Sequence, residues 1–235
     1  MTDPHAKIVI LTGAGISAES GIETFRAEDG LWAQHRVEDV ATPEGFMRDP
    51  ELVVNFYNAR RAQLPEVAPN AAHRALAHLE THHRGEVIVI TQNVDDLHER
   101  GGSQSVYHMH GELNSALCAA CENRWPAPMV MAPGDPCPRC AAPAARPDIV
   151  WFGEMPYEMD TLFAHLGQAD VFAAIGTSGN VYPAAGFVAE ARRAGAHTIE
   201  FNLEPSAVGN QFQEHRTGPA SRTVSDWVLS IIGRQ

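Results

Sequence analysis

The chain has 235 residues, of which 44% are hydrophobic and 20% charged, with four cysteines and a formal net charge of -12. This length and composition fit a single folded unit with inserts and exclude a disordered chain. The acidic balance provides no basic face for nucleic acid or an anionic membrane, so we expect neither as a partner. No apolar run is long enough to cross a bilayer and the N-terminus does not resemble a signal peptide, so we expect a cytoplasmic protein.

Short apolar runs alternate with helical stretches along the chain, which is typical of βαβ units. Several of these runs are apolar at successive residues, as in strands that helices cover on both faces. We therefore predict an α/β fold with a Rossmann-type parallel sheet and helices on both faces. The predicted strands are Lys7–Thr12, Val87–Thr91, Ser105–Met109, Asp148–Phe152, Val171–Gly176 and His197–Phe201.

Capping residues and prolines predict where the helices begin. Asp49 and Pro50 indicate a helix that runs to Leu64, and Asn70 indicates the next one. The later helices are expected to begin at Pro183, with an end at Gly195, and at Ser225, with an end near Ile232.

Two segments, 21–65 and 113–147, interrupt this alternation. The first has helical signals where a second strand is expected, and the second holds all four cysteines and no clear period. We predict that they form a small domain made of a helical module (21–65) and a zinc module (113–147). The large domain of this single catalytic unit, 1–235, would then comprise 1–20, 66–112 and 148–235.

A glycine loop follows the first predicted strand. Residues 13–18 match the pattern G-x-G-x-x-A between a strand and a predicted helix. Glycines there permit a tight turn and close approach to a dinucleotide pyrophosphate, although a turn without ligand has the same sequence. A dehydrogenase would carry an acid about 20 residues further on. Residues 30–36 do not provide it and Glu204 could replace it from a later strand, which disfavours hydride transfer.

The four cysteines form two C-x-x-C pairs separated by 15 residues. That spacing is typical of a zinc ribbon, in which four thiolates close the metal site and leave no position for water. A redox pair or inert buried thiols are the alternatives. We predict one structural Zn²⁺ held by Cys118, Cys121, Cys137 and Cys140.

Several sequence blocks, taken in order with these cysteines, resemble the sirtuins, which are NAD-dependent protein-lysine deacylases. The likeness extends from residue 8 to about 225 and is greatest to bacterial sirtuins of the desuccinylase-like class (class III). It implies that NAD and an acyl-lysine peptide enter a cleft between the two domains. The blocks are Gly13–Arg26, Thr91–His98, His108–Glu112, Gly176–Ser178 and Asn202–Glu204.

The resemblance also implies the reaction. The acyl oxygen attacks C1′ of the nicotinamide ribose, nicotinamide leaves, and the products are free lysine and an O-acyl-ADP-ribose. His110 matches the histidine base, whose imidazole can take a proton near neutral pH. Asn93 and Asp95 match contacts to the nicotinamide ribose and carboxamide. Taken alone, His110 is more often structural, and Asn93 and Asp95 could simply cap a helix.

The resemblance assigns further residues to NAD and to the peptide, and for the apolar ones core packing is the alternative. Phe152, Gly153 and Glu154 match one edge along which a substrate peptide lies as an added strand, and 179–181 match the other. The remaining NAD contacts are Gly13, Ala14, Gly15, Ser17, Ile22, Phe25, Arg26, Gln92, Val94, Gly176, Thr177, Ser178, Asn202, Leu203, Glu204 and Ala220.

Tyr57 and Arg60 stand three residues apart on the helix predicted from Asp49. That spacing turns both side chains to one side, where a guanidinium and a phenol can bind a carboxylate. In sirtuins this pair marks enzymes that remove acidic acyl groups, so we expect succinyl, malonyl and acetyl groups as substrates. The alternative is a solvated helix face, because Arg61 follows directly.

Three residues depart from the sirtuin pattern without touching the catalytic or zinc positions: Glu23, Gly101 and Asn180. Glu23 adds negative charge beside the glycine loop, and Asn180 could tune peptide preference. Two other functions remain open, a protein ADP-ribosyltransferase on the same scaffold and a non-enzymatic NAD-sensing module.

Overall fold

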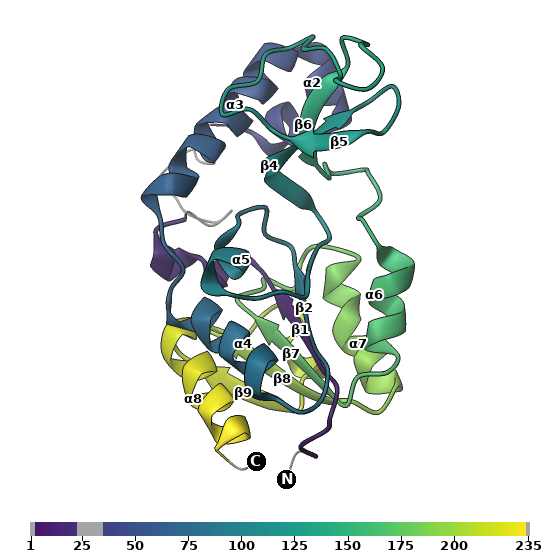
Figure 1. Cartoon of the computed structure of the whole chain (residues 1–235). Helices are drawn as coiled ribbons and strands as arrows, with labels where there is room; N and C mark the ends of the chain where they lie inside the picture. Colours follow the sequence, from purple (N-terminus) through teal and green to yellow (C-terminus); the bar gives the residue numbers. More distant parts are fainter. Residues whose placement is uncertain (1–2, 23–34, 234–235) are drawn as a thin grey trace.

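The computed structural model describes residues 3–22 and 35–233, and within them a six-stranded sheet forms the large part of the molecule (Figure 1). Its order is β3-β2-β1-β7-β8-β9 and every pair of neighbours is parallel. Five of its strands confirm the predicted runs to within one residue at either end. The strands are β1 (Ile8–Thr12), β2 (Val87–Thr91), β3 (Val106–His108), β7 (Val171–Ile175), β8 (His197–Asn202) and β9 (Glu214–Thr217).

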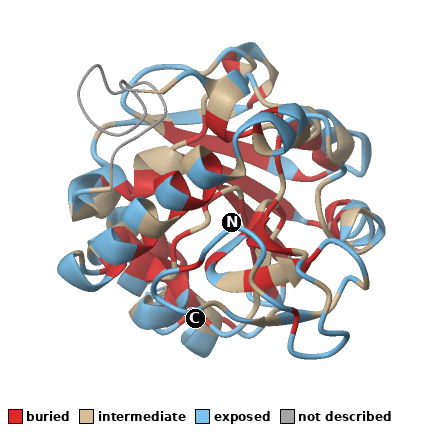
Figure 2. Ribbon diagram, turned by 90° about the horizontal axis from the view of Figure 1, so that it is seen from above, coloured by how far each residue is buried: buried red, intermediate tan, exposed pale blue. Residues whose placement is uncertain are grey.

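Helices cover both faces of this sheet, as predicted. Along β1, Ile8 and Ile10 pack toward α4 (Ala71–His82) and α8 (Ala220–Ile232), while Val9 and Leu11 pack toward α6 (Met159–Leu166) and α7 (Phe187–Arg193). The two faces therefore carry separate apolar cores, and the buried strands lie between exposed helix surfaces in Figure 2. This burial explains why β1, β2 and β7 are apolar at nearly every position.

Two predicted helix starts are confirmed by their caps. The Asp49 carboxylate accepts the Leu52 N–H at 2.9 Å at the start of α3 (Pro50–Gln63). The Asn70 side chain accepts the Ala72 N–H at 2.9 Å at the start of α4. The predicted start at Ser225 is wrong, because α8 begins directly after Pro219 and the Ser225 hydroxyl bonds back to a carbonyl one turn earlier.

A smaller antiparallel sheet, β5-β4-β6, packs with α3 at the other end of the molecule (Figure 1). The predicted large-sheet strand Asp148–Phe152 is wrong, because the strand is β6 and belongs to this small sheet. The strand β6 has no apolar pattern in the sequence, because it buries polar residues. Arg146, for example, is buried with its ion pair to Glu154. The remaining elements are β4 (Gly111–Cys118), β5 (Arg124–Pro126), β6 (Ala145–Ile149), α1 (Val37–Val40), α2 (Pro43–Arg48) and α5 (Leu97–Gly101).

Single-turn 3₁₀ helices complete the fold. The helix predicted after the glycine loop is wrong in form, because two such turns stand there, Ala14–Ile16 and Ala18–Ser20. The others are Leu64–Glu66, Ala184–Gly186 and Gly209–Gln211. Among the helices that the structure describes, none has the length and apolarity of a membrane span.

Candidate active site and zinc site

A cleft of about 410 Å³ lies between the carboxyl ends of the large-sheet strands and the small sheet. Parallel sheets bind ligands at this edge, next to the point where the strand order reverses, which here is the β1–β7 junction. The structure brings most of the predicted residues together there. Those lining the cleft are Gly13, Ala14, Gly15, Ile22, Tyr57, Arg60, Gln92, Asn93, Val94, Asp95, His110, Phe152, Gly153, Glu154, Gly176, Thr177, Ser178 and Asn202.

Other predicted residues lie outside this lining. Ser17 is buried just behind it, Leu203 and Glu204 point to solvent after β8, and Ala220 packs at the start of α8. Leu203 is 68% exposed and does not line the cleft. The predicted contacts Phe25 and Arg26, together with the departure Glu23, lie outside the described residues.

The glycines of the loop are required by contact between two segments of backbone. A Cβ on Gly15 would lie 2.7 Å from the Gly176 Cα, and a Cβ on Gly176 would lie 2.4 Å from the Ile16 nitrogen. Gly176 also has a φ of 63°, which disfavours other residues. The Gly15 N–H is already bonded to the Gly176 carbonyl at 2.9 Å, so the loop has fewer free donors for a pyrophosphate than the motif predicts.

A buried hydrogen-bond network joins the glycine loop to the segment after β2. The Ser17 hydroxyl donates to Asp95 Oδ2 at 3.1 Å and accepts from Asn93 Nδ2 at 3.2 Å. His73 Nδ1 accepts the Asn70 N–H, which leaves His73 Nε2–H to donate to Ser17 Oγ at 3.4 Å. Ser17 thus fixes the side chains of Asn93 and Asp95 from behind, so it acts on the cleft through its neighbours.

Asp95 is a buried carboxylate with several donors. Burial raises its pKa above the ordinary value, although the Leu97 N–H at 3.1 Å, the Ser17 hydroxyl and the charges of His108 and Arg60 oppose this rise. The Leu97 contact is also the helix-start turn that the capping alternative predicted. The helix α5 itself is capped at Asp96 without a side-chain bond, so this turn precedes the cap, and the contact of Asp95 with NAD stays a prediction.

His110 faces the cleft just beyond β3, with one ring nitrogen fixed. Its Nδ1 lies 3.2 Å from the Gln92 carbonyl, which can only accept, so Nδ1 carries the proton and Nε2 is the free base. Burial lowers the pKa of His110 below its ordinary value, against the opposing bond to Gln92. The ring is therefore neutral at neutral pH and able to accept a proton at Nε2.

The end of the cleft where the resemblance predicts the acyl group (the acyl end) is formed by α3 and the segment after β6. Trp151 Nε1 donates to Tyr57 Oη at 3.1 Å, which leaves the phenol proton of Tyr57 free to bond a ligand. Burial raises the pKa of Tyr57 to about 12, so this proton stays in place. Arg60 lines the same region, whereas Arg61 is 1% exposed and bonds the Leu113 carbonyl, so the solvated-face alternative is wrong for Arg61.

Sequence reasoning missed two residues that support this end of the cleft. The Arg146 guanidinium stacks 3.5 Å from the Trp151 ring centroid and binds both Glu154 oxygens at 2.7 and 2.9 Å. Although burial opposes its ionisation, Glu154 has a lowered pKa because of Arg146 and the Trp151 N–H. No sequence pattern singles them out, because their contacts with each other and with Glu154 form only in the fold.

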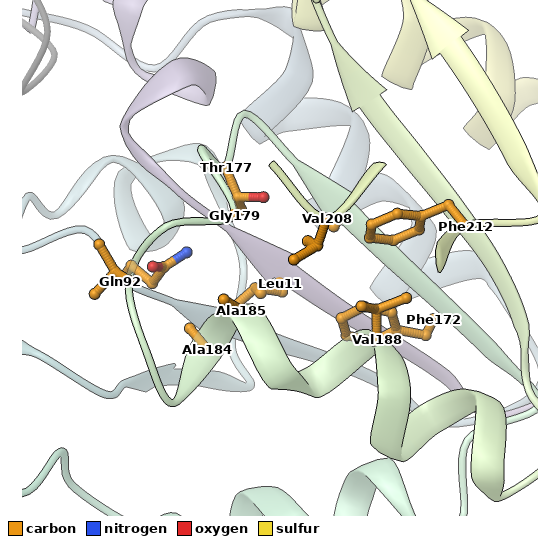
Figure 3. Close-up of a pocket in the computed structure, with 12 residues that line it drawn as sticks. Leu11, Gln92, Phe172, Thr177, Gly179, Ala184, Ala185, Val188, Val208 and Phe212 are labelled. Carbon is orange, nitrogen blue, oxygen red and sulfur yellow. The ribbon is translucent and has the colours of Figure 1, made fainter. Parts of the chain in front are cut away.

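A second pocket lies on the α7 side of the sheet, beneath the loop that follows Gly176 (Figure 3). Its walls are mainly apolar, with Leu11, Phe172 and Val188 facing Phe212. It holds only about 10 Å³, which is the space of one water at most. We interpret it as a packing gap next to the cleft.

The four cysteines form a cluster whose geometry fits a metal. Their Sγ atoms all lie within 4.8 Å of one another, with Cys118–Cys140 at 3.7 Å and Cys121–Cys137 at 3.8 Å. Four thiolates about 2.3 Å from a tetrahedral Zn²⁺ lie about 3.8 Å apart, whereas a disulfide would be far shorter. The thiols therefore fit Zn²⁺ and do not form disulfides.

The two cysteine loops repeat one backbone pattern. The residue after each second cysteine, Glu122 or Ala141, has a φ near 60° and donates its N–H to the carbonyl of the first cysteine at 2.9 Å. Left-handed conformations are costly for such residues unless the surroundings hold them. Although burial raises the pKa of the Cys137 thiol, the N–H groups of Cys140 and Arg139 outweigh it and lower that pKa to about 6. For Cys121 the Asn123 N–H lowers the pKa, but the neighbouring thiols outweigh it and raise the pKa to about 12.

Comparison with known proteins agrees with this geometry. A model described as the Sir2 family matches residues 13–183. An NAD-dependent protein deacylase of Vibrio cholerae is 58% identical over 238 residues, covering 100% of this chain and 97% of that protein. One from Shigella flexneri is 58% identical over 229 residues, covering 96% and 84%.

Solved structures show the same likeness. A Sir2 homologue in complex with NAD matches with a TM-score of 0.89 and 38% identity, covering 97% of this chain and 90% of that one. A Sir2 mutant with a p53 peptide and NAD matches with a TM-score of 0.76 and 28% identity, covering 97% and 92%.

Proposed function

This chain belongs to the Sir2 family, and from that premise we propose that it is an NAD-dependent protein deacylase that removes succinyl, malonyl and acetyl groups from lysine. The deacylase activity agrees with the two NAD-dependent protein deacylases that are 58% identical to this chain, which covers 97% and 84% of their lengths. The observation that supports acidic acyl groups is the pairing of Tyr57 with Arg60 at one end of the cleft. A half-buried guanidinium beside a protonated phenol can bind an acyl carboxylate with three donors.

The residues of the cleft have distinct roles in this proposal. NAD supplies the ribose carbon that accepts the acyl oxygen. Asn93 and Asp95, held from behind by Ser17, orient the nicotinamide end of NAD. His110 takes a proton from a ribose hydroxyl at Nε2 while Gln92 holds its Nδ1–H.

The substrate peptide would lie between Phe152–Glu154 and the loop after Gly176. Phe152 is half exposed at the mouth of the cleft, and Glu154 is held by Arg146 and by the Trp151 N–H at 2.8 Å. An added strand gains main-chain bonds from both edges, so the acyl-lysine can extend inward.

The deciding experiment incubates the protein with NAD and peptides that carry acetyl-, malonyl- or succinyl-lysine, and identifies every product by mass spectrometry. Free lysine peptide with O-acyl-ADP-ribose in solution supports deacylation. ADP-ribose attached to protein would support the ADP-ribosyltransferase alternative instead. NAD binding with no product from any peptide would support the sensing module.

Arg60→Met is expected to lower kcat/KM for succinyl-lysine at least about tenfold, since a charge-assisted contact to the carboxylate is lost. Activity on acetyl-lysine should persist, because that acyl group makes no such contact. The two rates are measured on one peptide sequence with either acyl group. Arg74→Met, on the exposed face of α4, is the control. Equal loss for both acyl groups would contradict the carboxylate assignment.

Acid pH should reduce deacylation through His110. The base form of the ring exists above its pKa, and burial lowers that pKa below 6.5, so activity is lost only as the pH falls through this lower value. A profile of kcat/KM against pH measures it. An acid limb centred above 6.5 would contradict the assignment of His110 as the buried neutral base.

A further inference from the structure

A second histidine, His108, stands two residues before His110 and has no assigned role. It ends β3 in register with Thr91 at the end of β2. Its Nε2 lies 2.8 Å from Glu99 Oε1 on α5, and its Nδ1 lies 3.2 Å from the Asn93 carbonyl. Both partners only accept, so both ring nitrogens carry protons and the ring is an imidazolium.

The surroundings of His108 support this charged state. Its side chain is 9% exposed. Burial lowers its pKa, but the bond and charge of Glu99 outweigh burial, Glu112 adds to them, and the net pKa is raised. His110 shows the opposite balance, because its one fixed partner is neutral. The two histidines of the motif are therefore a cation and a base.

The contact with Asn93 fixes a peptide group at the cleft. The Asn93 N–H is bonded to Thr91 Oγ1 at 3.0 Å, its side chain to Ser17, and its carbonyl to His108. Because the N–H, the side chain and the carbonyl of Asn93 are all bonded, the path of the backbone from Asn93 to Asp95 is fixed. The positive ring also favours the ionised form of the buried Asp95.

We propose that His108 is a positioning residue for NAD: with Glu99 as its anchor, it clamps the Asn93 carbonyl and so holds Asn93 and Asp95 ready for the nicotinamide end. This rests on the proposed function, which gives Asn93 and Asp95 their NAD contacts. It adds an imidazolium clamp, distinct from the base His110, that joins α5 to the floor of the cleft.

Two substitutions separate the bonds of the ring. In His108→Asn the amide nitrogen takes the place of Nδ1 and can still donate to the Asn93 carbonyl, whereas in His108→Gln it takes the place of Nε2 and can reach only Glu99. We expect His108→Gln to raise the NAD dissociation constant and the KM for NAD about tenfold, and His108→Asn to raise them about threefold or less. The KM for the acyl peptide should be unchanged in both variants.

Glu99→Ala completes a double-mutant cycle. If Glu99 acts through His108, the double variant with His108→Gln should bind NAD no more weakly than His108→Gln alone. Calorimetry gives the dissociation constants, and circular dichroism gives the melting temperatures. His197→Gln is the matched control, because His197 forms a similar pair with Glu214 at 3.1 Å on the exposed end of β8.

Equal NAD affinity in wild type and His108→Gln would overturn the proposal, as would equal losses in the Asn and Gln variants or additive losses in the cycle. If His108→Gln does not fold, the test rests on His108→Asn and Glu99→Ala. Wild-type affinity for NAD in both of these variants would overturn the proposal. The acyl-group proposal is tested separately by the wild-type protein. If the wild-type protein binds NAD but leaves succinyl-lysine intact, the acyl-group proposal is contradicted and the His108 proposal is unaffected.

Discussion

His110→Ala is expected to lower kcat for deacylation by about 10²–10⁴-fold, which is the range for removing a positioned general base. The loss follows from the geometry, because the Gln92 carbonyl fixes Nδ1–H and leaves Nε2 as the base that faces the cleft. Binding of NAD should change little, since Asn93, Asp95 and the glycine loop are untouched. The expected result is thus a fall in kcat with the NAD dissociation constant retained.

Steady-state rates with an acyl-lysine peptide and calorimetry with NAD measure the two quantities. His82→Ala is the control, because His82 is exposed on the last turn of α4 and does not line the cleft. Turnover of His110→Ala equal to that of wild type would exclude His110 as the base. A measurable turnover in both proteins would then require another base, whereas no turnover in either would favour the non-enzymatic NAD-sensing module.

The large sheet could be predicted because its signals are local. The runs of β1, β2 and β7 are apolar at successive positions, and this pattern needs no partner to be recognised. The edge strand β9 could not be predicted. Its sequence is Glu-His-Arg-Thr, its side chains alternate between half-buried and exposed, and only its bonds to β8 make it a strand.

The cleft could be predicted as a set of residues, but its support could not. Tyr57 and Trp151 meet across 94 residues, and Arg146 is buried only because Glu154 and the Trp151 ring surround it. No pattern along the chain shows such partners in advance. The same holds for the start of α8, where the turn at Pro219 outweighs the capping preference of Ser225.

His108 and His110 show this limit most clearly. The sequence places both in one motif, and nothing in their spacing separates a cation from a base. Glu99 and the Asn93 carbonyl define the first, and the Gln92 carbonyl defines the second. A histidine's protonation state is a property of its partners, so it follows from the fold.

Removing zinc is expected to lower the melting temperature by about 10 °C, because structural Zn²⁺ contributes folding energy directly and each kcal/mol shifts a chain of this size by about 2–4 °C. The small sheet depends on the metal in particular. Cys118 ends β4, where it pairs with Ala145 of β6, and Cys137 is buried beside it. Acyl-lysine cleavage should fall with the metal, since β6 leads directly into Trp151 and the acyl end of the cleft.

Titration with a chelator measures this, with zinc content by atomic absorption, melting temperature and deacylation followed together. Cys137→Ser should reproduce the loss without chelator, because a hydroxyl is a far weaker zinc ligand than a thiolate. Ser225→Ala is the control, because it removes a hydroxyl from α8, which packs against the large sheet away from the cysteines. A zinc-free preparation with wild-type melting temperature and activity would contradict the structural role, because the four thiols would then hold the small sheet without a metal.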